Sequence, residues 1–343
     1  MTFQVPFDRG KLSFELPTGW RGDVAESRIV PPIQDVPAAV AEAVAHPVNS
    51  PPLRELARPG DKACIVFTDI TRASPDYLLV PPLLAELAAA GVRDQDITLL
   101  CGIGLHRPST REEKVAKLGQ DVVERYRVID NEPLNPEALV DLGTTASGIP
   151  LSVHRAAYEA DILIATGIVE PHQYAGYSGG RKTLAVGAAG EAMIAYTHGP
   201  AMIDHPGTRL ARIEGNPFHE AITEAARRAG LRFILNVVQD DEKRVVFVRA
   251  GEPEATFKEL VAFAKEQGMP VSDDMPDSEV WQLIFMPGFS TAEAVTDLSG
   301  RGVGMDVVRR NITSIGGRID INSVAGHGTH IAIRLPLTLA ILD

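Results

Sequence analysis

The chain has 343 residues, a length that at about 150 residues per domain predicts two or three domains. Its 33 basic and 45 acidic side chains give a net charge of −12, which argues against the basic surface of a nucleic-acid-binding protein. The hydrophobic content of 45% predicts a globular chain, and no apolar run reaches the roughly 18 to 20 residues of a membrane helix. The first residues lack a signal-peptide pattern, and Cys64 and Cys101 have no CxxC spacing. We therefore expect buried reduced thiols in a cytoplasmic protein that binds neither nucleic acid nor membrane.

The segment before residue 18 alternates apolar and polar residues as a strand does. Between residues 60 and 267, short apolar runs alternate with helical patterns. The runs predict strands at 62–68, 97–101, 126–130, 161–166 and 233–238. A helix over 76–90, closed by Gly91, and another opened by the capping-box pair Thr110 and Glu113 separate them. Continuous apolar runs are typical of strands buried on both faces, so we expect an α/β domain with a largely parallel, Rossmann-like sheet.

Three polar clusters follow the carboxyl ends of predicted strands, at residues 69–72, 104–107 and 170–172. In an open parallel sheet these ends lie along one edge, where ligands bind. Any single cluster is more simply explained as a polar surface loop. Because all three occupy the same kind of position, we expect one shared pocket.

The segment 170–182, EPHQYAGYSGGRK, is the richest in candidate chemistry. Its glycines allow close backbone approach to a phosphate or a flat cofactor, and Lys182 could act there as a charge or as a nucleophilic amine. Such a string alone is more often a tight surface turn. Six of the nine histidines fall between residues 106 and 219, which favours a metal or acid–base site over isolated structural histidines.

Four strings together resemble the nickel-dependent lactate racemase family over its N-terminal domain, from about residue 8 to 271. They are DITR at 69–72, GLHR at 104–107, the 170–182 segment, and THGPAMIDHPGTRLARIEGNPFHEA at 197–221. The His–x9–Lys–x15–His order is the most specific part of the match. In that family a pyridinium mononucleotide, the nickel pincer nucleotide, is joined to a lysine through a thioamide, and one histidine completes the nickel coordination.

The resemblance implies a role for each matching residue. Lys182 would be the attachment site and His198 the nickel ligand, with His106 and His172 as the two acid/base histidines. Asp69 and Arg72 would support the site, Arg72 by pairing with the substrate carboxylate. The remaining cofactor-binding residues would come from the glycine-rich loop: Gly176, Tyr177, Ser178, Gly179 and Gly180.

The implied reaction is racemisation or epimerisation of a small 2-hydroxy acid such as lactate. The α-carbon of such an acid gives a poorly stabilised carbanion, so moving its hydrogen as hydride to an electrophilic cofactor avoids that species. The hydroxyl must lose its proton at the same time, and two enantiomers require a base for each hydroxyl orientation. Sulfur donors with one imidazole suit square-planar nickel(II).

In place of the racemase family's C-terminal domain, residues 272–343 resemble the ATP-binding domain of chemotaxis histidine kinases. The acidic stretch 272–279 suits a linker, GRGVGMD at 300–306 matches the glycine-rich phosphate box, and 318–322 with 329–335 alternate as a β-hairpin. The metal-holding Asn and the adenine-reading Asp-x-Gly-x-Gly box are not found, so we expect a partial α/β-sandwich fragment that does not bind ATP.

The expected domains are therefore 1–271, racemase-like and catalytic, and 272–343, a partial kinase-type ATPase fragment. Because the racemase family's C-terminal domain closes over the site, we expect its loss to impair racemisation, so that the cofactor loads without efficient turnover. Two alternatives to a racemase remain: a fragment of a sensor-kinase signalling protein, and a chimera in which neither activity is complete.

Overall fold

The computed structural model describes residues 2–7, 10–15, 30–266, 318–324 and 328–334. The chain divides into two compact units, one of residues 27–271 and one that combines residues 1–26 with 272–343. The larger unit contains every residue predicted for the site.

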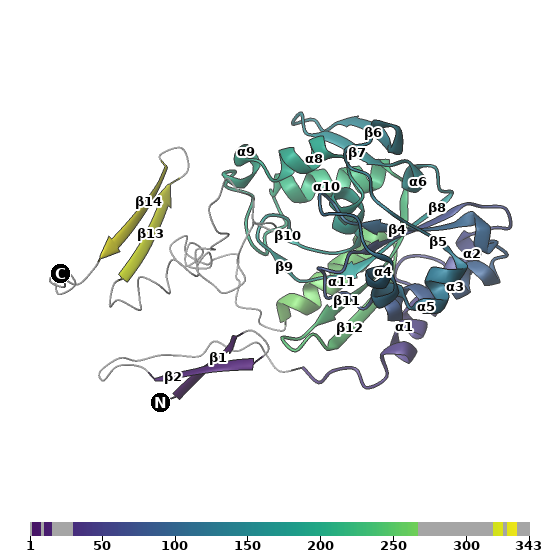
Figure 1. Ribbon diagram of the computed structural model, residues 1–343, viewed down its shortest axis with the longest axis horizontal. Helices are drawn as coiled ribbons and strands as arrows, with labels where there is room; N and C mark the ends of the chain where they lie inside the picture. Colours follow the sequence, from purple (N-terminus) through teal and green to yellow (C-terminus); the bar gives the residue numbers. More distant parts are fainter. Residues whose placement is uncertain (1, 8–9, 16–29, 267–317, 325–327, 335–343) are drawn as a thin grey trace. The chain divides into compact units, whose positions relative to one another are not determined.

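A six-stranded sheet forms the centre of the larger unit, in the order β12-β11-β8-β3-β4-β5 (Figure 1). All neighbouring pairs are parallel except β11 and β12, which are antiparallel. The strands are β3 (Ala63–Thr68), β4 (Ile97–Gly102), β5 (Arg127–Asp130), β8 (Ile162–Ile168), β11 (Leu231–Gln239) and β12 (Val245–Gly251). The prediction of a largely parallel α/β sheet is confirmed.

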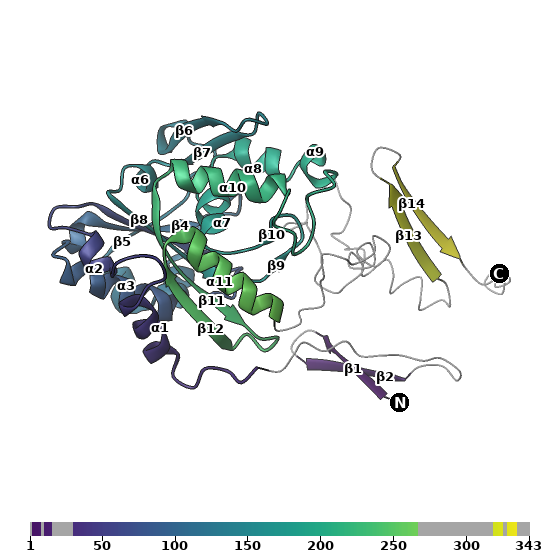
Figure 2. The same ribbon diagram turned by 180° about the vertical axis from the view of Figure 1, so that it is seen from behind.

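Helices cover both faces of this sheet. The longer ones are α1 (Val36–Ala45), α3 (Asp76–Ala89), α4 (Arg111–Leu118), α10 (Pro217–Arg228) and α11 (Pro253–Glu266). The shorter ones are α2 (Leu53–Leu56), α5 (Gln120–Arg125), α6 (Arg155–Tyr158), α7 (Gly180–Lys182), α8 (Glu191–Thr197) and α9 (Pro200–Ile203). Figure 2 views the unit from the side on which α10 and α11 lie.

The core explains why the central strands are continuous apolar runs. Every residue of β3 is buried, and alternate side chains enter different clusters. Ile65 and Phe67 join the cluster that includes residues of α1 and α3. Cys64 and Val66 join the cluster that includes residues of α10 and α11. The strand is therefore apolar on both faces, as a central strand between two helix layers must be.

The predicted elements agree closely with the observed ones. The helix predicted at 76–90 is α3, which runs through Pro81 and Pro82, and the capping box of Thr110 and Glu113 has both of its hydrogen bonds. The sequence reading missed the antiparallel edge strand β12 and the small hairpin of β6 (Leu139–Thr144) and β7 (Pro150–His154). Cys64 and Cys101 are buried and unbridged, as expected, and burial raises the pKa of each thiol to about 12.

The smaller unit shows two antiparallel hairpins among its described residues. They pair β1 (Thr2–Phe7) with β2 (Gly10–Glu15), and β13 (Arg318–Val324) with β14 (Gly328–Arg334). The strand-like start and the C-terminal hairpin were both predicted. The predicted linker at 272–279 and the glycine-rich box at 300–306 lie outside the described residues. In the described part of the chain, no helix combines the length and apolar character needed to cross a membrane.

Candidate active site

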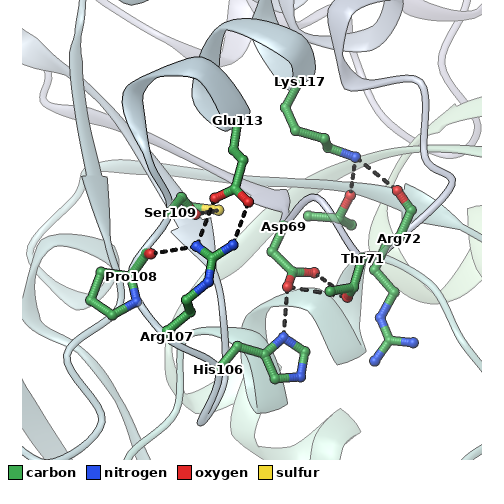
Figure 3. Close-up of polar contacts among 11 residues, drawn as sticks. Asp69, Thr71, Arg72, His106, Arg107, Pro108, Ser109, Glu113 and Lys117 are labelled. Atoms are coloured by element: carbon green, nitrogen blue, oxygen red, sulfur yellow. Dashed lines mark hydrogen bonds and ion pairs between the residues drawn. The ribbon is translucent and has the colours of Figure 1, made fainter. Parts of the chain in front are cut away.

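Asp69 and His106 meet at the carboxyl ends of neighbouring strands. Asp69 follows β3, His106 lies in the loop after β4, and the His106 Nδ1 is 2.6 Å from the Asp69 Oδ2 (Figure 3). The Thr71 hydroxyl donates to both oxygens of the same carboxylate. Burial alone would raise the pKa of Asp69, but the hydrogen bonds from His106 and Thr71 outweigh it, so the pKa is lowered. Ionised Asp69 thus holds the ring proton on Nδ1 and leaves Nε2 as the basic nitrogen of His106.

The loop that carries His106 is tied to α4. Arg107 pairs with the carboxylate of Glu113, Nη1 to Oε2 at 2.9 Å, and also donates to the carbonyl of Pro108 at 3.0 Å (Figure 3). Because the Arg107 side chain is 65% exposed, this ion pair adds little free energy. Instead, the ion pair attaches the loop that carries His106 to the first turn of α4.

His172 comes from the two-stranded ribbon of β9 (Pro171–His172) and β10 (Gly176–Tyr177), after β8. Its Nδ1 accepts hydrogen bonds from the backbone N–H groups of Tyr174 and Ala175, at 3.2 and 3.1 Å. Burial, followed by the positive charges of Lys182 and Arg72, holds the pKa of His172 well below its usual value. The ring is therefore neutral near pH 7, with its proton on Nε2.

His198 directly follows α8, as its C-cap residue, and shares aromatic neighbours with His172. Its ring centroid lies 5.2 Å from that of the buried Phe218 and 6.1 Å from that of Tyr174, and both of those rings also approach His172. The His198 Nδ1 donates to the carbonyl of Ile194 at 3.0 Å. This bond directs the lone pair of Nε2 away from the helix, the arrangement usual for a metal-binding imidazole.

Packing inside the protein leaves little room for a side chain at the glycines of the 170–182 loop. A Cβ on Gly176, which has φ +74°, would lie 2.0 Å from the carbonyl oxygen of Arg212. A Cβ on Gly180 would lie 3.1 Å from the carbonyl oxygen of Ala165 and 3.2 Å from the amide oxygen of Asn236. At these two positions the expected ligand cradle is filled by the protein itself, by the segment around Arg212 at Gly176 and by strands β8 and β11 at Gly180.

Two further loop residues also face the protein. The Tyr177 ring is buried in the core, and the Ser178 hydroxyl donates to the carbonyl of Ile168 at 2.8 Å. Their predicted role in binding a cofactor is not supported by these side-chain contacts, and it remains a prediction for their backbone groups.

Lys182 ends α7 and leads directly into a π-helix, Thr183–Gly187. Gly187 in this turn contacts the loop that follows β4: the Gly104 N–H donates to the Gly187 carbonyl at 2.8 Å. A single π-turn at such a position is often a mark of a functional site. Here it connects the backbone of the Lys182 segment to the loop that carries His106.

The predicted polar residues form two groups, a pair of Asp69 with His106 and a set of four around His172. One hydrogen bond joins Asp69 to His106, and electrostatic or ring contacts join His172 to Arg72, Lys182 and His198. Tyr174 and Phe218 were not predicted from the sequence, although each packs against both His172 and His198. Both lie inside the matched strings, so only their apolar character concealed them.

A cavity of about 430 Å³ lies elsewhere, between α10 and α11, and includes none of the predicted residues in its lining. Arg181, the neighbour of Lys182, enters it and stacks on the ring of Phe257, 4.0 Å from the centroid.

Most of the larger unit matches a known protein family. Residues 7–211 match the profile of the lactate racemase N-terminal domain. The chain belongs to this family. Lactate racemase of Thermoanaerobacterium thermosaccharolyticum is 32% identical over 268 residues, which are 77% of this chain and 62% of that protein. The apoprotein structure of the lactate racemase from the same organism superposes with a TM-score of 0.67 at 33% identity, again over 77% and 62% of the two chains. The chain thus spans about three fifths of the length of this racemase.

The C-terminal part is similar to a different family. Residues 221–339 match the profile described as histidine kinase-, DNA gyrase B- and HSP90-like ATPase. Chemotaxis protein CheA of Klebsiella aerogenes is 65% identical over 86 residues, which are 25% of this chain and 13% of that protein. The start of the ATPase match lies in α10, although α10, β11, β12 and α11 pack into the core of the larger unit. Both resemblances seen in the sequence are confirmed.

Proposed function

We propose that the chain is a racemase or epimerase domain for a small 2-hydroxy acid such as lactate. The observation that carries the proposal is the pairing of His106 with an ionised Asp69, together with a second, neutral histidine, His172, that follows the neighbouring strand β8. Two histidines with different proton positions at one sheet edge suit a reaction that must remove a hydroxyl proton and return one.

The residues fit a nickel pincer nucleotide. In the described part of the chain, no group of three or more His, Cys, Asp or Glu side chains is placed to hold a metal ion. In this proposal a nickel ion near His198 would take its other ligands from the bound cofactor. Lys182 would hold that cofactor covalently, and His198, oriented by the Ile194 carbonyl, would supply the imidazole. When bound, the cofactor would supply the electrophile that accepts and returns the hydrogen of the substrate's α-carbon.

His106 is the residue prepared to take the hydroxyl proton, because Asp69 fixes its other nitrogen as a donor. Arg72 would pair with the substrate carboxylate, and His172 would donate from Nε2 to the substrate oxygen. The low pKa of His172 depends partly on the charges of Lys182 and Arg72. Amide-type attachment at Lys182 and a bound carboxylate at Arg72 would cancel both charges. That change would remove two of the causes that lower the pKa of His172, whereas burial, the largest cause, would remain.

Intact mass measurement after co-expression with a cofactor-synthesis pathway tests the assignment. We expect an added covalent mass on the peptide that contains Lys182, and no adduct in Lys182→Ala. His198→Ala should keep the adduct but weaken nickel retention by at least 10- to 100-fold. Lys258→Ala, at an exposed position of α11, is the control that should load normally. An adduct that persists in Lys182→Ala would overturn the proposal.

The similarity to CheA makes ATP-linked signalling the second candidate. We propose that residues 1–271 form the racemase-like part and residues 272–343 a partial ATPase fragment. Because the boxes for metal and adenine are missing from the sequence, we expect no ATP binding in the micromolar range. A saturable, magnesium-dependent ATP titration would favour the signalling function instead.

A further inference from the structure

A buried ion pair contacts the inner side of the loop that carries Asp69 and Arg72. The Lys117 Nζ, on α4, is 2.9 Å from the Oδ2 of Asp76, in the first turn of α3. Asp76 is fully buried and also accepts from the hydroxyls of Thr68 and Thr166, both at 2.6 Å. The carboxylate therefore joins the ends of β3 and β8 to α3, and its charge is balanced by Lys117.

Lys117 also binds the backbone of the loop. Its ammonium donates to the carbonyl of Arg72 at 3.1 Å (Figure 3) and to the carbonyl of Ser74 at 2.8 Å. The carbonyl between them, that of Ala73, accepts from the side-chain amide of Gln239 at 3.1 Å. Three successive carbonyls are thus held by side chains from α4 and β11, which lie far away in the sequence.

These hydrogen bonds fix the backbone position from which the Arg72 side chain extends. The loop from 70 to 73 is exposed at its side chains, so packing alone does not define its path. In Figure 3 the Arg72 guanidinium and the His106 ring extend to the same side, away from Lys117. We infer that Lys117 is a positioning residue: its ammonium fixes the backbone of residues 72–74 and so presents Arg72 to the substrate carboxylate. The link to substrate rests on the proposed function, whereas the fixing of the loop does not.

Helix α4 offers a matched control within one turn. Lys114 is also largely buried, but its Nζ pairs with the Oδ2 of Asp130, at the end of β5, at 2.8 Å, and not with the carbonyls of residues 72–74. Removing one member of a buried pair leaves an uncompensated charge, so each pair is best changed together. The test compares the full chain with Lys117→Met/Asp76→Asn and with Lys114→Met/Asp130→Asn.

The first measurement is native-state trypsin cleavage after Arg72, followed by fragment mass and requiring no cofactor. Loss of the two carbonyl contacts should speed this cleavage about tenfold in the Lys117 pair, whereas the Lys114 pair should match the parent chain. Urea unfolding of each protein corrects for any change in global stability. An unchanged rate in the Lys117 pair, or an equal rise in both pairs, would overturn the inference.

The second measurement uses cofactor-loaded protein and lactate. We expect the Lys117 pair to raise KM about tenfold while kcat changes less than about threefold, since a displaced Arg72 weakens binding of the carboxylate. A fall in kcat with unchanged KM would contradict the link to Arg72. If the parent chain does not racemise lactate, the proposed function fails, and trypsin cleavage still decides whether Lys117 holds the loop.

Discussion

At the scale of single residues, the chemistry of the site depends on which ring nitrogen of each histidine carries the proton. His106 uses Nδ1 to donate to Asp69, whereas His172 uses Nδ1 to accept from two backbone N–H groups. The two rings therefore offer opposite Nε2 chemistry, one a lone pair and the other a proton. Their types were predictable from the sequence, but this difference was not.

We expect Asp69→Asn to disable the base without disturbing cofactor attachment. An amide can donate to His106 Nδ1 and so stabilise the wrong tautomer, with the proton on Nε2. Racemisation of lactate should fall about 100-fold or more in kcat, within the range of general acid–base catalysis. The Lys182 adduct should form as in the parent chain. Asp121→Asn, at an exposed position of α5, is the control, and an Asp69→Asn chain of normal activity would disprove the role of the pair.

At the scale of elements, the π-helix Thr183–Gly187 connects two parts of the site. A Cβ on Gly187 would lie 2.7 Å from the carbonyl oxygen of Gly102 and 2.9 Å from its Cα. Both neighbours are backbone atoms of β4, so they cannot yield as a flexible side chain would.

Gly187→Ala should therefore separate the Lys182 segment from the end of β4. We expect a loss of about 1 to 3 kcal/mol in the free energy of unfolding, typical of overpacking, measured by urea titration. Gly60→Ala is a useful comparison, because Gly60 has φ +93° but open space around it. Its cost should be the backbone strain alone, about 1 kcal/mol. Equal costs for the two variants would show that the contact between Gly187 and Gly102 is unimportant.

At the scale of the whole molecule, buried histidines make stability depend on pH. Burial is the largest cause of the lowered pKa of His154, His172 and His219, and the pKa of His219 falls from 6.5 to about 4. The unfolded chain binds a proton at His219 near pH 6.5, but the folded chain does so only near pH 4. The contribution to stability is complete above pH 6.5 and is lost as the pH falls through this window.

We expect the free energy of unfolding to decrease between pH 7 and pH 4.5, with about 3 kcal/mol available from His219 over its whole window. Far-UV circular dichroism in urea at several pH values measures this slope. His219→Gln should flatten the slope, whereas His46→Gln should leave it unchanged, because the His46 side chain is 75% exposed. Stability that rises as the pH is lowered from 6.5 would contradict the prediction.

The class of fold and the residue types available for chemistry were predictable from the sequence alone. Apolar runs such as 62–68 could be interpreted because burial on both faces leaves a one-dimensional pattern. Asp69, His106 and His172 could be placed at one edge because each follows a strand of a parallel sheet. The edge strand β12 was missed although residues 245–248, VVFV, form an apolar run; only its antiparallel pairing with β11 required the structure.

How these residues work together depends on contacts between segments that are remote in the sequence. No pattern shows that Lys117 binds the carbonyls of Arg72 and Ser74, because hydrogen bonds to backbone leave no mark on residue type at the accepting positions. The same is true of the glycines: their conformational freedom is visible in the sequence, but the atoms that fill the space beside them are not. Gly176 could have faced a cofactor or a neighbouring chain segment, and the carbonyl of Arg212 occupies that space. Residue types thus define which chemistry is available, whereas distances between remote segments decide which of it is used.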